Sequence, residues 1–188
     1  AIYQKGWMHG IEVFNEKEWY PEALQWALDK KLSITGNSDI HDFYNKRYNR
    51  ELFPVRPVTL VFAKEKTEES LKEAMFDRRT ATLFFNKLIG PREFVEPLVN
   101  QCIQVHEPFL YENGYIYFEV KNSSDIEFTL LKTGKDDSGL PEKTILPRRS
   151  IIVARVKQEA EKEHSYSFRL ENVLIGVEQY GSLSFTVK

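Results

Sequence analysis

The spacing of apolar residues changes near Phe85, and this change most constrains how the chain can fold. Before it, short apolar runs alternate with stretches in which apolar residues recur at helical spacing; after it, apolar and polar residues alternate one by one. Because a strand places successive side chains on opposite faces, the second pattern is typical of half-buried strands. The sequence therefore predicts an α/β part followed by an all-β part.

The first part begins with a strand–helix–strand pattern. Residues 10–14 (GIEVF) and 32–35 (LSIT) are apolar runs suited to buried strands. Between them, Pro21 opens a stretch in which Leu24 and Leu28 recur at helical spacing, and proline is favoured at the first position of a helix. Such a unit predicts two parallel strands joined by a right-handed crossover.

The pattern then repeats. Residues 57–63 (PVTLVFA) predict a strand, 67–79 a helix capped by Thr67, and 80–84 another strand. The polar and aromatic segment 42–54 between the two patterns predicts a long loop. The α/β part therefore reads as two successive strand–helix–strand units.

The second part reads as a series of short strands. Strands are expected at 98–105, 115–121, 126–131, 150–157, 164–171, 173–177 and 182–187. Asn113-Gly114 is a strong hairpin signal before the second of these. About seven short strands in this length predict a β-sandwich. We place the boundary at 86–92 and predict domains at 1–88 and 89–188.

Composition excludes some classes of protein. With 41% hydrophobic residues, the chain has enough apolar surface to bury cores. A net charge of −2 gives no general attraction to nucleic acid or anionic membranes, and no apolar run is long enough to span a bilayer. Cys102 is the only cysteine, which excludes an internal disulfide. We expect neither a nucleic-acid partner nor a membrane partner.

The loop Gly36 to His41 (GNSDIH) holds the clearest chemical signal. Asp39 and His41 lie two residues apart, directly after a predicted strand, so that a carboxylate oxygen and an imidazole nitrogen can converge on one metal ion. The alternative is a loop cap or an ordinary polar contact. Asn15 follows the first strand and Glu12 lies inside it, and both are candidates to support the site or contact a substrate.

Several segments together resemble the PHP (polymerase and histidinol phosphatase) family of metal-dependent phosphoesterases. The similar segments are GIEVFN at 10–15, LSITGNSDIH at 32–41, RPVTLVFA at 56–63 and the stretch 74–81. They occur in the family's order and cover roughly residues 6–84. The chain most resembles a bacterial subgroup that carries a β-rich C-terminal extension.

The resemblance implies a fold and a site. The fold is the C-terminal part of a distorted (β/α)7 PHP-type barrel, followed by the β-sandwich. Asp39 and His41 match the family's last two metal ligands, and the complete site holds up to three divalent ions, usually zinc, manganese or iron. Glu12 matches the glutamate of a Gly-x-Glu-Val strand. The family's early His-x-His motif and its further ligands are not in this sequence, so we expect this chain alone to be incomplete and inactive.

The resemblance also implies hydrolysis of a small phosphorylated substrate by metal-activated water. Arg56, together with Arg47 and Arg50, is a candidate to grip a phosphate; the alternative is a solvated charge or an ion pair. His9, just before the first strand, is a weaker candidate to bind metal or support a ligand. The sequence singles out no catalytic acid, base or nucleophile.

A second function from another class stays open. The β-rich part could be a module that binds a glycan or a protein, with the first part as a non-catalytic mount. For location, the resemblance implies a periplasmic or exported protein, because the subgroup often carries an export signal; otherwise we expect a cytoplasmic one. The oligomeric state is not indicated.

Overall fold

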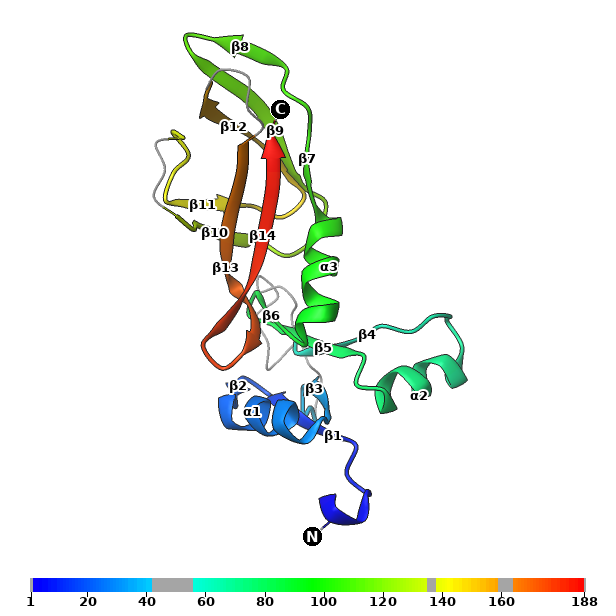
Figure 1. Cartoon of the computed structure of the whole chain (residues 1–188). Coiled ribbons are helices and arrows are strands. Elements are labelled where there is room, and N and C mark those ends of the chain that lie inside the picture. Colours follow the sequence, from blue (N-terminus) through cyan, green and yellow to red (C-terminus); the bar gives the residue numbers. More distant parts are fainter. Residues whose placement is uncertain (1, 42–55, 135–137, 159–163, 188) are drawn as a thin grey trace. The chain divides into compact units, whose positions relative to one another are not determined.

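The chain folds into two compact units, which are described separately (Figure 1). The structure is a computed structural model that describes residues 2–41, 56–134, 138–158 and 164–187. The first unit comprises residues 1–95 and 173–179, and the second comprises 96–172 and 180–188. The predicted domain ranges 1–88 and 89–188 stay a prediction.

The first unit is mixed α/β and begins as the sequence predicts. Its elements are η1 (Tyr3–Lys5), β1 (Gly10–Asn15), β2 (Glu18–Trp19), α1 (Pro21–Lys30), β3 (Ser33–Asn37), β4 (Val58–Val61), α2 (Glu68–Phe76), β5 (Thr80–Phe84) and β6 (Lys87–Ile89). Pro21 opens α1, and β1 pairs with β3 in parallel from Gly10–Ser33 to Asn15–Asn37. The short strand β2, antiparallel to β1, was not predicted.

The second strand–helix–strand segment departs from the prediction. Strands β4 and β5 pair antiparallel, from Val58–Leu83 to Val61–Thr80. The Thr67 side chain caps α2 as expected, but the helix ends at Phe76 rather than at residue 79. The chain then reverses through Arg78, which has a left-handed φ of 63°. Apolar spacing predicted these elements correctly but carries no information on strand direction, so the expected repeat of a parallel unit is wrong.

The core of the first unit lies between α1 and the strands. Its buried residues are Val13, Phe14, Leu24, Ala27, Leu32, Ile34, Phe84 and Ile89. Strand β6 pairs antiparallel with β5 and parallel with Val173 and Leu174, which the later chain contributes to this unit. Among the described residues the strands close no barrel. The unit is therefore an α/β fold with open sheets as far as the structure describes it.

The second unit is rich in β-structure. Its elements are most of α3 (Arg92–Cys102), β7 (Ile103–Val105), β8 (Leu110–Glu112), β9 (Tyr115–Asn122), β10 (Phe128–Lys132), β11 (Lys143–Leu146), β12 (Ser150–Lys157), β13 (His164–Gly176) and β14 (Gln179–Val187). Strand β9 lies between β12 and β7, and β10 lies between β11 and β13. Packing of these sheets as a sandwich stays a prediction.

The hairpin and alternation predictions are confirmed. Asn113 and Gly114 have φ of 51° and 78° and join β8 to β9 at the Glu112–Tyr115 pair. Two positive φ values in a two-residue loop match the twist of the flanking strands. Along β9 every second residue is buried, including Phe118. The alternation in the sequence therefore identified the inward face of this strand.

The expected strand at 98–105 is wrong over its first half. Residues 98–102 end α3, and only Ile103–Val105 form a strand, β7. Val95 and Val99 lie four residues apart within α3 and are both buried. Because that spacing places side chains on one face of a helix, it decides the local structure in favour of α3.

A buried asparagine ties the end of β9 to two neighbouring loops. Asn122, 1% exposed, donates from Nδ2 to the carbonyls of Ile126 (2.7 Å), Leu146 (3.3 Å) and Pro147 (2.8 Å). Its Oδ1 accepts from the backbone N–H (3.0 Å) and hydroxyl (2.8 Å) of Ser124. Buried polar groups need such partners, so this side chain fixes the turn that follows β9.

An exposed ion pair beside this turn should contribute to stability in a way that depends on pH. Arg149 donates to both carboxylate oxygens of Asp125, with 2.9 Å from Nη2 to Oδ2, and this hydrogen bonding lowers the pKa of Asp125 below its ordinary value. A carboxylate whose pKa is lower in the folded state than in the unfolded state stabilises the fold at pH values above the unfolded pKa. This stabilisation is lost as the pH falls through the folded-state pKa. Arg149→Ala should therefore reduce stability slightly at pH 7 and by less at about pH 3, which is below the unfolded pKa of about 3.9. Chemical denaturation at both pH values checks this, and Asp125→Asn should give the same profile; an equal loss at both pH values would contradict it.

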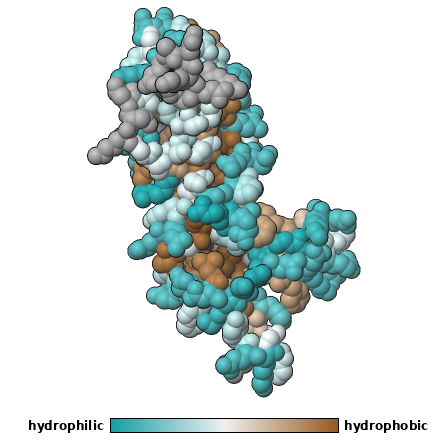
Figure 2. All heavy atoms as spheres, in the orientation of Figure 1, coloured by the Kyte–Doolittle hydropathy of each residue, from teal (hydrophilic) through white to brown (hydrophobic). Residues whose placement is uncertain are grey.

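The surface adds one negative finding. No helix in the described ranges is long and apolar enough to cross a membrane. On the face shown in Figure 2 hydrophilic residues dominate, and apolar atoms lie in small patches.

Candidate metal site

Asp39 and His41 face each other just beyond the end of β3. His41 Nε2 lies 3.1 Å from Asp39 Oδ1, and both side chains are exposed, at 83% and 50%. Asp39 has a left-handed φ of 45°, which turns the chain sharply after the strand. The loop therefore presents the two side chains together at the carboxyl end of β3.

This separation fits two ligands of one metal ion. With bonds of about 2.0–2.2 Å to nitrogen and oxygen, two ligands of a tetrahedral zinc ion lie about 3.3 Å apart. The distance of 3.1 Å between Nε2 and Oδ1 is close to that value. The same distance also suits a direct hydrogen bond between imidazole and carboxylate. The donor set, one imidazole and one carboxylate, suits zinc and manganese.

Threonine side chains hold the end of β3 in place. Thr80 Oγ1 accepts from the Ile34 N–H (3.1 Å), and Thr59 Oγ1 accepts from the N–H of Gly36 (3.0 Å) and donates to its carbonyl (3.2 Å). Thr59 lies on β4 and Thr80 on β5. Among the described residues, this edge of β3 is thus held by hydrogen bonds to threonine side chains, and not by backbone hydrogen bonds to β4 or β5. Nothing in the apolar spacing distinguishes these threonines from ordinary strand residues, so the sequence analysis missed them.

Glu12 and two asparagines form a cluster at the same end of the sheet. Asn15 Nδ2 donates to Glu12 Oε2 at 2.7 Å, and Asn37 Nδ2 donates to Glu12 Oε1. The Asn37 carbonyl also accepts from the N–H of Glu16 at 3.0 Å. The carboxylate of Glu12 is therefore engaged in orienting Asn37, two residues before Asp39. The structure brings Glu12 and Asn15 together; Asn37 was not singled out by the sequence.

Arg56 borders the same open hollow as Asp39. The hollow has a volume of about 420 Å³ and is also lined by Gly36, Asn37, Ser38, Pro57, Val58 and Thr59. A guanidinium in such a position can bind a phosphate through two hydrogen bonds. Arg47 and Arg50, the other arginine candidates, lie outside the described residues.

His9 is not brought to this site. It precedes β1, whereas Asp39 follows β3, and because the two strands are parallel these positions lie at opposite ends of the pair. The His9 ring packs edge-on against Phe76 with centroids 4.7 Å apart. Together with Met75 it borders an apolar hollow of about 280 Å³. These contacts place His9 in an apolar setting, away from the other candidates.

The described residues do not complete a metal centre. Within them, no group of three or more His, Cys, Asp or Glu side chains is placed to hold an ion. Structural and catalytic zinc sites use three or four protein ligands. Asp39 and His41 therefore supply fewer ligands than such a site needs, as far as the structure describes the chain.

One solved structure is similar to this chain along the chain's whole length. The family models and the curated proteins searched gave no match. The whole chain aligns with a crystal structure from Bacteroides vulgatus ATCC 8482, a two-domain protein containing a predicted PHP-like metal-dependent phosphoesterase, at 31% identity and a TM-score of 0.91. The chain spans 55% of the length of that protein. The comparison agrees with the resemblance found in the sequence: the chain is similar in fold to a PHP-like two-domain protein.

Proposed function

We propose that the chain is part of a metal-dependent phosphoesterase. The observation that carries the proposal is the convergence of Asp39 Oδ1 and His41 Nε2, 3.1 Å apart, at the carboxyl end of a parallel strand. Ligand sites of parallel α/β folds gather at this end of the strands. The likeness to a PHP-like protein supports the same reading.

In this proposal Asp39 and His41 hold one of up to three divalent ions, of zinc, manganese or iron. Such an ion, when bound, lowers the pKa of a coordinated water and neutralises charge on a phosphoryl group. Glu12 keeps Asn37 and the loop after it in place through the two asparagine amides. Arg56, on the rim of the adjacent hollow, binds a phosphate oxygen of a small phosphorylated substrate.

The proposal extends to the rest of the fold. The first unit then belongs to a distorted (β/α)7 barrel whose other strands, and further metal ligands, come from a longer form of the protein. A periplasmic or exported location is part of the same proposal and follows from the family resemblance alone.

Metal affinity tests this function. In a form of the protein that supplies the further ligands, isothermal titration with Zn²⁺ and Mn²⁺ should show that Asp39→Ala and His41→Ala each weaken binding by about tenfold or more, because each removes one ligand. His106→Ala is the matched control, since His106 Nδ1 lies 3.1 Å from Glu119 Oε2 in a similar exposed pair of the second unit. That variant should bind metal like the parent chain.

Turnover gives the second measurement. In a form of the protein that supplies the further ligands, hydrolysis of a model phosphate monoester should require added metal and be lost in Asp39→Ala. Unchanged metal affinity in both ligand variants, or metal-independent hydrolysis that survives them, would contradict the proposal.

A further inference from the structure

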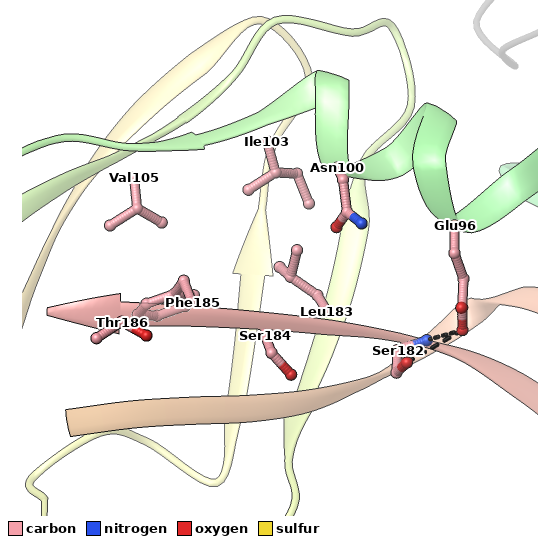
Figure 3. A pocket seen from close by; sticks show the side chains of 9 residues that line it. All are labelled: Glu96, Asn100, Ile103, Val105, Ser182, Leu183, Ser184, Phe185 and Thr186. Atoms are coloured by element: carbon pink, nitrogen blue, oxygen red, sulfur yellow. Dashed lines mark hydrogen bonds between the residues drawn. The ribbon is translucent and has the colours of Figure 1, made fainter. Parts of the chain in front are cut away.

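The second unit contains a cleft that the proposed hydrolase does not use. It has a volume of about 490 Å³ and lies between β14 on one side and α3 with β7 on the other. Figure 3 shows Glu96 and Asn100 pointing from α3 toward β14, with Glu96 bonded to Ser182 at one end. Pockets of about 300–1,000 Å³ are the usual size for bound ligands.

At the β7 wall of this cleft, the strand edge that faces away from β9 has no strand partner among the described residues. The His106 N–H donates to the Glu119 carbonyl and the Ser123 N–H to the Cys102 carbonyl, both at 2.9 Å. In an antiparallel pair, residues alternate between bonding the partner strand and pointing away from it. The backbone N–H and C=O groups of residues 102, 104 and 106 therefore point toward β9. Val105 pairs in register with Val120, and its backbone N–H and C=O groups point away from β9.

The β14 wall presents a second edge of the same kind. The Ser182 N–H points to α3, where it donates to Glu96 Oε1 at 2.9 Å. By the two-residue period, the backbone groups of Ser184 and Thr186 point the same way. Their hydroxyls contact those of Ser167 (2.8 Å) and Ser165 (2.9 Å) on β13, a closeness typical of pairs that exchange no backbone bonds.

We propose that this cleft binds an extended peptide, which adds to the unit as a further strand. The outward N–H and C=O groups of Val105, Ser184 and Thr186 are donors and acceptors in the alternation that an extended backbone matches. The five residues from Ser182 to Thr186 offer an edge about 15 Å long, enough for about four or five peptide residues. Ile103 and Leu183, both buried, supply apolar surface for alternate side chains.

Charge gives the peptide a direction. Among the described residues that line the cleft, Glu96 is the charged one, and it lies at the Ser182 end, where its carboxylate already accepts from Ser182. A lysine, an arginine or a free amino terminus at the matching end of the peptide complements this carboxylate. The occupant is thus a short extended peptide that is apolar in its middle and basic at one end. This inference does not depend on the proposed hydrolase activity.

Amide hydrogen exchange of the free 188-residue chain gives the first test. The amides of Ser184, Thr186 and Val105 should exchange fast, whereas those of Phe185 and Gln104, which face β13 and β9, should be protected. Protection of all five amides in the free chain would mean that both edges are already paired, and would overturn the proposal.

Binding of defined peptides gives the second test. An immobilised library of peptides about seven residues long should yield binders that carry a basic residue at one end. The best of them should protect Ser184 and Thr186, and N-methylation of its alternate amides should weaken binding by about tenfold, because each methyl removes a backbone donor. This comparison leaves the protein unchanged and so does not depend on the folding of any variant.

A matched pair of variants locates the binding. Val105→Lys places a charge in the cleft and should weaken peptide binding by about tenfold or more, whereas Gln104→Lys, at the next and exposed position of β7, should leave it unchanged. The proposal fails if no peptide binds, if N-methylation has no effect, or if both variants bind alike. Concentration-dependent dimers with protection at Ser184 would assign the edge to a second copy of the chain instead.

Discussion

Replacing Asn122 with alanine should destabilise the second unit by about 4 kcal/mol. The substitution removes one shared donor from the carbonyls of Ile126, Leu146 and Pro147, and it removes the acceptor of the Ser124 N–H. The Ser124 hydroxyl also loses Oδ1 as an acceptor and is left with its weaker bond to the Ile126 carbonyl, at 3.2 Å. Since Asn122 is almost fully buried, water cannot replace these partners without opening the turn. Urea denaturation followed by circular dichroism measures the loss.

Asn172→Ala is the matched control for this prediction. Asn172 Nδ2 donates to the Glu127 carbonyl at 2.7 Å and Oδ1 accepts from the Thr129 N–H at 3.1 Å, and the residue is only partly buried. Its loss should cost about 1–2 kcal/mol. Equal effects of the two alanine variants would show that the turn does not depend on the Asn122 side chain.

Asn122→Asp separates the lost hydrogen bonds from the lost volume. The new carboxyl keeps the shape but cannot donate when ionised, and burial among carbonyls raises its pKa in the folded state. A raised folded-state pKa favours the fold at low pH, and the benefit disappears as pH rises through that pKa. The variant should therefore lie closest to the parent in stability at acid pH, and a pH-independent difference would contradict the assignment.

Gly36→Ala is expected to destabilise the first unit by about 3 kcal/mol or more. A Cβ at residue 36 would lie 2.0 Å from Thr82 Oγ1 and 3.2 Å from Thr82 Cβ. Thr82 is fully buried and donates to the Val58 carbonyl at 3.2 Å, so moving its hydroxyl out of the way breaks a buried hydrogen bond. Thermal or urea denaturation measures the change.

A double-mutant cycle shows whether this contact is the cause. Thr82→Ala removes the Oγ1 that the new methyl would meet, so the loss from Gly36→Ala should be smaller by about 1–2 kcal/mol in the Thr82→Ala background. Additive losses would place the strain elsewhere, for example at Phe14, whose Cβ lies 3.5 Å from the same position. Because Gly36 comes three residues before Asp39, metal binding should weaken together with stability.

Local sequence patterns identified many elements but not how they connect in space. Pro21, Thr67 and the Asn113-Gly114 pair act through their own backbone geometry or hydrogen bonds, so their effects are visible in a short window of sequence. The direction of β5 against β4 depends on how the chain returns after α2, which no local pattern records. The residues at 98–102 fit both the two-residue spacing of a strand and the spacing of a helix. They form a helix, in which Val95 and Val99 are buried on one face.

The candidate site was predictable only where residues lie close in sequence. Asp39 and His41 are two positions apart, and the structure indeed places their side chains in contact. Contacts of Glu12 with Asn37 and of Gly36 with Thr59 and Thr82 join residues more than twenty positions apart. Such contacts depend on which strands lie side by side in space, so they require the fold. His9 shows that closeness in sequence can also mislead. It is next to β1 in the sequence, but it precedes β1, whereas Asp39 follows the parallel strand β3, so the two residues lie at opposite ends of the pair.

Strand β13 has a consequence for attempts to divide the chain. Val173 and Leu174 on this strand pair with Leu88 and Ile89, so the first unit is discontinuous in sequence. A truncated chain ending near residue 90 would expose the outer edge of β6, which bears buried apolar side chains, and an unpaired apolar edge promotes self-association. Separate production of the two units therefore calls for a circular permutant or a linker that reconnects residues 95 and 173, rather than a single cut.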